Sequence, residues 1–234
     1  MRRLALFARA PVEGLVKSRL SPALPSRLAA SLYAGLLADA FEALARAGAD
    51  ERLVYWAGPP GESPFDVHVR AQSEGDLGAR LAAAFEDLLF ASGDHALVLG
   101  SDVPGLAAAH IDAAFAALDR HDVVLGPARD GGYWCIGLTR TAPELFRDIP
   151  WSTPEVLQRT LERAHETNRT VAFTPPLDDL DTPADLAFLA GALASGRRAC
   201  SRHGHAALAA MGLVPDWLGA NASAAEEASS RSAP

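Results

Sequence analysis

Cysteine is scarce in this sequence, and the two residues present form no recognisable motif. Cys135 and Cys200 lie far apart, without a CxxC or CxxH pattern. This excludes a disulfide framework and a cysteine-ligated zinc centre, so both are expected to be reduced thiols. The seven histidines contain no HExxH arrangement, and we expect His203 and His205 to be surface residues rather than metal ligands.

An excess of positive charge is also absent. The chain carries 21 Lys and Arg against 29 Asp and Glu, which gives a formal net charge of −8. Nucleic acid and anionic membranes are therefore excluded as partners held by bulk electrostatics. Any phosphate group that the protein binds has to be held by a few local cations.

Long apolar runs are missing, although 49% of the 234 residues are hydrophobic. No uninterrupted run approaches the roughly 20 residues of a membrane-spanning helix. The first run, residues 4–8, is too short for a signal-peptide core and is ended by Arg9. We therefore expect a cytoplasmic protein without a membrane span, whose oligomeric state the sequence does not indicate.

The sequence does contain short apolar runs that alternate with longer segments of helical period. The expected strands are residues 4–8, 53–57, 67–69, 96–100, 123–126, 133–138 and 171–173. Apolar residues at helical spacing lie between them, at Leu28, Leu32, Leu36, Leu37, Phe41 and Leu44 and again at Leu81, Phe85, Leu88 and Leu89. This alternation predicts an α/β fold with a mostly parallel sheet flanked by helices on both faces.

One large domain is expected, over residues 1–196. Residues 197–218 are predicted to be a C-terminal extension packed on or near it, and residues 219–234, rich in Ala, Ser and Glu, a disordered tail. Two later helices are expected to start at hydroxyl caps. Ser152, with Pro154 and Glu155 after it, resembles a capping box, and Thr182 precedes Pro183 in the same way.

The loop after the first strand is the first candidate for binding. It contains the single glycine Gly14, which disfavours a dinucleotide site of the GxGxxG type. It also contains Arg9, Lys17 and Arg19, and ligands of open α/β sheets lie beyond the carboxyl ends of the strands. These cations suit a polyphosphate leaving group, although a solvated basic loop explains them equally well.

Asp102 is the second candidate, because the apolar run 96–100 delivers it to a strand end. There its carboxylate can hold Mg²⁺ or Mn²⁺ against a diphosphate. The alternative is that Asp102 caps a helix beginning near Pro104. A third candidate follows at Asp178, Asp179 and Asp181, three acids that repel one another unless a cation shared with Asp102 lies among them or the turn is simply exposed.

Two glycine-containing segments complete the candidate site. In residues 126–134, Asp130 can orient an acceptor or act as a base, and the acceptor-binding residues are expected to be Asp130, Gly131, Gly132, Tyr133 and Trp134. The same Asp-Gly-Gly is a strong turn signal. Residues 72–81 open the second helix, whose start offers Gly75, Gly78 and Arg80 to a nucleotide.

Taken together, these segments resemble the family of rSAM/selenodomain-associated transferase 1, also described as arsenosugar-biosynthesis glycosyltransferases. That family belongs to the GT-A-like nucleotide-diphospho-sugar transferase superfamily. The resemblance covers about residues 2–195 and rests on six pieces in order. They are residues 7–11 with 17–20, 75–81, 100–104, 126–133, 151–153 and 179–183.

The resemblance implies a single GT-A-like, Rossmann-like domain with a nucleotide at the carboxyl edge of its sheet. It implies that Lys17 and Arg19 face phosphates and that Asp102 contacts a metal, ribose or phosphate. The sequence departs from related families in two places. The Gly-rich first loop of sugar-phosphate nucleotidyltransferases is absent, and the double-acid DxD of many glycosyltransferases is reduced to residues 101–103.

The leading hypothesis is a metal-dependent transferase that moves a sugar from a nucleotide-diphospho donor to a small-molecule acceptor. Its catalytic residues are expected to be Lys17, Asp102 and Asp130, and its metal ligands for Mg²⁺ or Mn²⁺ are expected to be Asp102, Asp179 and Asp181. The alternatives are nucleotidyl transfer from an NTP to a small phosphorylated acceptor and a non-catalytic nucleotide-binding module. Release of nucleoside diphosphate or of pyrophosphate would separate the first two.

Overall fold

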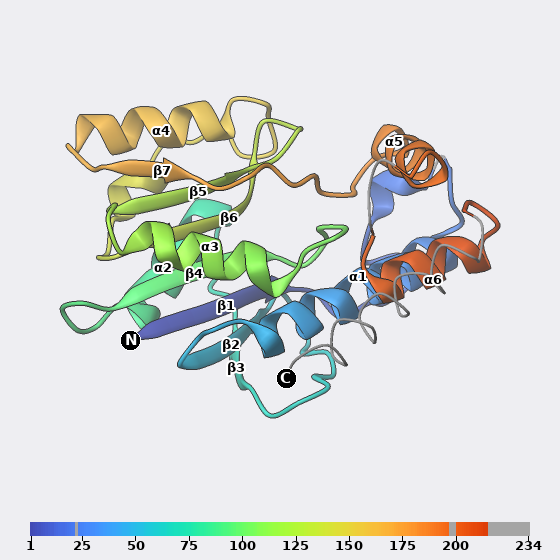
Figure 1. Cartoon of the computed structure of the whole chain (residues 1–234), viewed down its shortest axis with the longest axis horizontal. Coiled ribbons are helices and arrows are strands. Elements are labelled where there is room, and N and C mark those ends of the chain that lie inside the picture. Colours follow the sequence, from blue (N-terminus) through green and yellow to red (C-terminus); the bar gives the residue numbers. More distant parts are fainter. Residues whose placement is uncertain (22, 197–199, 215–234) are drawn as a thin grey trace, which may run out of the picture.

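Seven strands form one central sheet in the computed structural model, which describes residues 1–21, 23–196 and 200–214 (Figure 1). The strands are β1 (Arg2–Ala8), β2 (Glu51–Trp56), β3 (His68–Ala71), β4 (His95–Gly100), β5 (Val123–Pro127), β6 (Tyr133–Leu138) and β7 (Val171–Phe173). Their order across the sheet is β3-β2-β1-β4-β6-β5-β7. Only β6 pairs antiparallel with its neighbours, so the predicted, mostly parallel α/β sheet is confirmed.

Helices cover both faces of this sheet, as predicted. They are α1 (Ser26–Arg46), α2 (Leu77–Leu88), α3 (Ala108–Leu118), α4 (Val156–Glu166), α5 (Pro183–Ala194) and α6 (Arg202–Ala210), with short 3₁₀ helices η1 (Ser18–Leu20) and η2 (Pro143–Phe146). One core packs α1 and α3 on Leu4, Leu6 and Val54. The other packs α2 and η2 on the alternate residues Ala5, Leu53 and Val98.

A third apolar cluster lies beyond the carboxyl ends of the strands. It joins η1 and the first half of α1 to α5 and α6, which lie together to one side of the sheet in Figure 1. Helix α1 is long and apolar enough to cross a membrane by length and composition. In this fold its apolar residues pack against the sheet and against α6.

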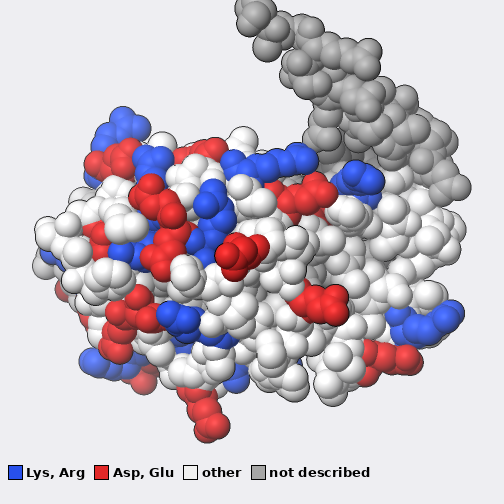
Figure 2. All heavy atoms as spheres, turned by 90° about the horizontal axis from the view of Figure 1, so that it is seen from below, with Lys and Arg blue, Asp and Glu red and all other residues white. Residues whose placement is uncertain are grey.

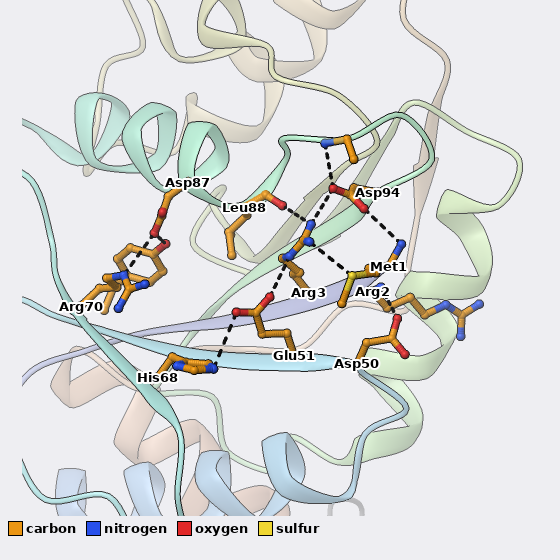
Figure 3. Close-up of polar contacts among 12 residues, drawn as sticks. Met1, Arg2, Arg3, Asp50, Glu51, His68, Arg70, Asp87, Leu88 and Asp94 are labelled. Carbon is orange, nitrogen blue, oxygen red and sulfur yellow. Dashed lines mark hydrogen bonds and ion pairs between the residues drawn. The ribbon is translucent and has the colours of Figure 1, made fainter.

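The opposite, amino-terminal edge of the sheet is joined by a buried guanidinium (Figure 3). Arg3 at the start of β1 is 3% exposed and donates to Asp94 at 2.6 Å, to Glu51 at 2.8 Å and to the Leu88 carbonyl at 2.8 Å. The hydrogen bond from Arg3 lowers the pKa of Asp94 to about 2, and the bond from the amino group of Met1 acts in the same direction. This network ties β1, β2, α2 and the residue before β4 together at one edge.

The surface in Figure 2 carries basic and acidic side chains interspersed, with large uncharged areas between them. No extended patch of one sign is visible on this face. The cations that could bind a phosphate therefore have to be sought individually in the fold.

Three local expectations have clear outcomes. Thr182 caps α5, with Asp185 completing a capping box, as predicted. Ser152 does not cap α4, because that helix begins at Val156 and Ser152 takes a positive φ of 65° in the turn before it. His205 was expected at the surface but is 5% exposed, because α6 packs that side against the third cluster.

The expected tail, residues 219–234, lies outside the described residues.

Candidate functional site

The carboxyl ends of the parallel strands converge on a cleft at one edge of the sheet. β1, β2, β3 and β4 all end there, because they are parallel neighbours. A hollow of about 440 Å³ lies over their ends and is lined by the loop after β1, residues 100–102, Tyr33, Gln72, Arg80 and Asp181. A second hollow of about 580 Å³ shares Arg9, Leu15, Ala57, Gln72 and Arg80 with it, so the two form one continuous cleft.

Lys17 is the central cation of the cleft. Its backbone takes the left-handed conformation, φ 52° and ψ 34°, immediately before η1. Only 5% of its side chain is exposed, and Nζ donates to Asp102 Oδ2 at 2.6 Å while lying 3.6 Å from Asp181 Oδ1. Burial by itself lowers the pKa of Lys17, but attraction and hydrogen bonding to Asp102, with Asp181 and Asp179 adding to them, outweigh burial and raise it. Lys17 is therefore a buried, permanently charged ammonium.

Asp102 follows β4 and contacts that ammonium rather than a helix. Helix α3 begins only at Ala108, after the extended residue Ala107, so Asp102 does not cap it. The main-chain oxygen of Asp102 instead accepts a hydrogen bond from Leu180 N at 3.1 Å. This bond brings the acidic segment after β7 to the end of β4, as the sequence hypothesis of a shared site requires.

The two acids beside Leu180 have different surroundings. Asp181 accepts a hydrogen bond from Arg19 at 2.7 Å and lies near Lys17, so its charge is largely balanced. Burial, followed by repulsion from Asp130 and Asp102, raises the pKa of Asp179 to about 7. Asp181 is therefore paired with two basic side chains, whereas Asp179 is influenced by Lys17 without an ion pair among the described residues.

The acidic residues at this edge are candidate ligands for a divalent metal. No group of three or more His, Cys, Asp or Glu side chains in the described parts of the chain is arranged to hold one. Mg²⁺ does not require such a group, since it is commonly bound by one or two carboxylates together with substrate phosphates and water. Asp179 and Asp102 fit that smaller donor set, because Lys17 contacts only Oδ2 of Asp102. In Asp181, by contrast, Lys17 and Arg19 engage both carboxylate oxygens.

Two further arginines line the cleft beside Lys17 and Arg19. Arg9 is exposed and borders both hollows. Arg80, in the first turns of α2, donates to the Gly75 carbonyl at 3.0 Å and to Gln72 Oε1 at 3.4 Å. The cleft therefore gathers four cations in a chain of net charge −8.

The two glycines at the start of α2 have different surroundings. Gly75 takes a φ of +104° in the turn before the helix and borders the second hollow. Gly78 is buried, and a Cβ there would approach the Phe146 carbonyl to 2.8 Å. Gly78 therefore serves packing against η2, and Asp76 rather than a ligand caps the helix by accepting from Ala79 N at 2.9 Å.

The loop between β5 and β6 brings Asp130 to the same edge. Asp130 is exposed, and its Oδ1 accepts from Gly132 N at 2.8 Å. Gly131 has a φ of +88°, and a Cβ there would clash with the Pro154 carbonyl, so the turn requires glycine. The aromatic residues do not present the expected accessible faces: Trp134 is 2% exposed and donates to the Pro175 carbonyl, and the Tyr133 hydroxyl is buried.

Sequence reasoning overlooked three residues that shape the cleft. Tyr33, Ser101 and Gln72 line it. Gln72 and Ser101 lie in the segments 72–81 and 100–104 that were singled out for their neighbours, and no role was assigned to them. Ser101 is adjacent to Asp102 and could have been inferred from its neighbour. Tyr33 lies in the apolar stripe of α1, where a tyrosine is ordinarily a core residue, so its position gave no signal.

Comparison with protein families identifies a match in the middle of the chain. Residues 38–153 match the model of a family described as "Uncharacterized protein conserved in bacteria (DUF2064)". This stretch contains four of the six pieces of the resemblance, whereas Lys17 and residues 179–183 lie outside it. Among curated proteins, no sequence matches the chain.

Solved structures similar to the chain share its α/β fold. A "putative nucleotide-diphospho-sugar transferase" from Desulfovibrio desulfuricans G20 is 28% identical, with a TM-score of 0.78 over 94% of this chain and 97% of that chain. A Mycobacterium tuberculosis Rv0371c homologue from Mycobacterium sp. strain JC1 is 17% identical, with a TM-score of 0.50 over 80% and 94%. The 4-diphosphocytidyl-2C-methyl-D-erythritol synthase from Anaerococcus prevotii DSM 20548 is 9% identical, with a TM-score of 0.51 over 80% and 95%. At such low identities the last two are similar in fold alone.

Proposed function

We propose that this protein is a metal-dependent glycosyltransferase that moves a sugar from a nucleotide-diphospho donor to a small-molecule acceptor. The observation that carries the proposal is Lys17, an ammonium with a 5% exposed side chain held at 2.6 Å from Asp102 in the cleft. Fixing a buried cation beside three arginines suits an anionic leaving group, which is stabilised most by charges that are already in place. The similarity to a solved structure described as a nucleotide-diphospho-sugar transferase agrees with this function.

In the proposed glycosyl transfer, the charged residues of the site act on the leaving group and on the acceptor. An acceptor hydroxyl oxygen forms a bond to the anomeric carbon, and the bond from that carbon to the diphosphate oxygen breaks with both electrons. Lys17 and Arg19 stabilise the charge on the departing nucleoside diphosphate. The proton of the hydroxyl passes to Asp130, which retains one carboxylate oxygen beside the one that accepts from Gly132.

The metal belongs to the proposal through Asp102 and Asp179. When bound there, Mg²⁺ or Mn²⁺ would neutralise part of the diphosphate charge next to the protein's own carboxylates. The third carboxylate of the sequence hypothesis, Asp181, remains a candidate ligand only if Arg19 releases it.

The runner-up function is nucleotidyl transfer from an NTP to a small phosphorylated acceptor. The exposed carboxylate of Asp130 argues against it, because an acceptor phosphate would have to approach this residue, which is not a ligand of the proposed metal. Repulsion between like charges disfavours that approach, whereas a neutral acceptor is unaffected. A non-catalytic nucleotide-binding module is the third possibility, and the set of charge-stabilising groups in the cleft is more than such a module needs.

A thermal-shift screen followed by product analysis tests the proposal. UDP-, GDP-, ADP- and CMP-sugars and the four NTPs are each added at the same concentration with and without Mn²⁺, since at a given concentration a tighter ligand of the folded protein raises Tm more. We expect a nucleotide-diphospho sugar to give the largest shift and the matching nucleoside diphosphate to be released on turnover. Release of pyrophosphate would establish nucleotidyl transfer, and binding without turnover of any donor and acceptor would establish the binding module.

Asp102→Asn tests the metal assignment. We expect this variant to lose the increase in nucleotide affinity that Mn²⁺ gives to the parent protein, because the amide is a poor ligand for a hard cation. The fold should persist, since Asp181 still faces Lys17 at 3.6 Å. Calorimetric titration of nucleotide with and without Mn²⁺ measures the effect, and a metal response equal to that of the parent would show that Asp102 is not a ligand.

A further inference from the structure

The hydroxyl of Tyr33 joins two strand ends at the floor of the cleft. Tyr33 lies on α1 and is 4% exposed. Its oxygen accepts a hydrogen bond from Arg9 N at 3.0 Å and lies 2.8 Å from Ser101 Oγ. Arg9 is the first residue after β1, and Ser101 is the first residue after β4. A single side chain of a covering helix therefore connects two neighbouring strands just where their pairing ends.

Both hydrogen bonds satisfy groups that the sheet leaves open. The ladder between β1 and β4 ends at the pair Phe7 and Gly100, so Arg9 N has no partner in β4. Ser101 is 5% exposed, and its hydroxyl also needs a partner inside the protein. The phenol supplies both contacts without introducing a charge, because burial raises the pKa of Tyr33 further above physiological pH.

Each residue touched by Tyr33 leads directly to a charged group of the cleft. The phenol accepts a hydrogen bond from the backbone N–H of Arg9, and the guanidinium is the side chain of that same residue. Asp102 is the residue after Ser101, and its carboxylate holds Lys17. The ammonium of Lys17 also lies 5.9 Å from the centre of the Tyr33 ring.

We infer that Tyr33 is a positioning residue, which sets the places from which Arg9, Lys17 and Asp102 act on the phosphates of the donor. This inference rests on the proposed function. Electrostatic stabilisation depends on charges held in fixed positions, so a loosened strand end weakens the contact with phosphate even when every charge is still present. A nucleoside has no phosphates, so we expect its binding to depend much less on these charges.

The test compares Tyr33→Phe with the parent protein by calorimetric titration in the presence of Mg²⁺. The probes are UDP, GDP, CDP and ADP, each paired with its own nucleoside. We expect Tyr33→Phe to weaken the best-binding diphosphate about tenfold and its nucleoside less than twofold, so that the ratio of the two affinities falls. Ser101→Ala removes one of the two hydrogen bonds and keeps the ring, and we expect it to lower the same ratio by a smaller factor.

Tyr55→Phe is the matched control. Tyr55 is also a buried tyrosine, 5% exposed, but its hydroxyl bonds to Asp87 on the other face of the sheet. Its variant should leave both affinities within twofold of the parent. If the parent binds a diphosphate and the ratio is unchanged in Tyr33→Phe and in Ser101→Ala, whatever happens to Tm, Tyr33 has only a structural role and the inference fails. If the parent binds no diphosphate, the proposed function itself fails.

Discussion

A full positive charge on Lys17 is retained where only 5% of the side chain is exposed. Such a position is costly for an ammonium unless carboxylates lie close, and here Asp102 and Asp181 supply them. Arg19 shares Asp181 but is 66% exposed, so water screens its charge. The two cations of one loop therefore differ in how much they can contribute to phosphate binding.

Alanine variants at these positions are expected to separate the two contributions. Lys17→Ala and Arg19→Ala should both weaken a nucleoside diphosphate more than its nucleoside, with the larger loss at Lys17. A charge-assisted contact contributes roughly 1.5 to 3 kcal/mol, and we expect Lys17 in that range and Arg19 below it. Calorimetric titrations of the diphosphate and of the nucleoside measure the difference.

Arg140→Ala is the control for Arg19. Arg140 is 61% exposed and pairs with Asp122 at 3.3 Å after the end of β6, at the opposite edge of the sheet. Its variant should bind the diphosphate like the parent. Equal losses for nucleoside and diphosphate in Lys17→Ala would remove this residue from the phosphate site.

At the scale of elements, α6 depends on a carboxylate that belongs to another helix. Ser201 makes no capping bond to α6, and Asp39 of α1 instead accepts from His203 N at 2.9 Å and from Gly204 N at 2.7 Å. The helices approach closely there, since a Cβ on Gly35 would lie 2.7 Å from the His203 carbonyl. Asp39 is 2% exposed, so these contacts join the C-terminal helix to the main fold.

Asp39→Ala should therefore destabilise the protein by about 2 kcal/mol, because it leaves one buried and one partly buried N–H group at a helix start unsatisfied. Urea unfolding measures the free energy of unfolding, and hydrogen exchange should show lost protection in α6. Asp112→Ala serves as the control, because Asp112 likewise accepts from a backbone N–H, that of Gly48 at 2.8 Å, but at an exposed site. An equal, small effect of both variants would mean that α6 docks without the carboxylate.

Across the whole molecule, the amino-terminal and carboxyl-terminal edges of the sheet differ in how their charged side chains are paired. The amino edge is joined by Arg3 and Asp94, both almost fully buried and mutually neutralised (Figure 3). The carboxyl edge holds the open cleft, and near it burial and repulsion from Asp130 and Asp102 raise the pKa of Asp179 to about 7. The buried charges at the amino edge are therefore paired with one another, whereas an acidic group near the proposed ligand site at the carboxyl edge is only partly balanced.

This arrangement predicts a pH dependence of stability that originates at the amino edge. The pKa of Asp94 is about 2 in the folded protein, below its value of about 4 in an unfolded chain. Its stabilising effect is therefore complete above about pH 4 and is lost as the pH falls through about 2. Asp94→Asn should lower the free energy of unfolding by about 3 kcal/mol at pH 7, because Arg3 then keeps a buried charge with one partner fewer.

Urea unfolding of parent and variant at pH 7, 5 and 3 tests this prediction. The difference between them should be constant from pH 7 to about 5 and should narrow below pH 4. A difference that stays the same down to pH 3, or that widens there, would show that the carboxylate charge of Asp94 does not stabilise the fold.

The sequence by itself determined the fold class, because alternating apolar runs and helical periods report burial along one chain. It also indicated which loops carry charged groups, since those loops follow apolar strands and parallel strands end at one edge. The helix starts predicted from the sequence were only partly correct. Thr182 caps α5, whereas Ser152 lies in a turn before α4. Capping is decided by backbone geometry that a four-residue pattern does not contain.

Only the tertiary structure decided how these groups are paired. Lys17 and Asp102 are 85 positions apart, and their contact depends on the left-handed turn at Lys17 and on the bond from Leu180 to the end of β4. The sequence pattern predicts that Tyr33 is a core residue. Its hydroxyl lies at the cleft only because α1 packs on the ends of two strands. Local patterns record what each segment buries, whereas a site is made by contacts between segments that are distant in the chain.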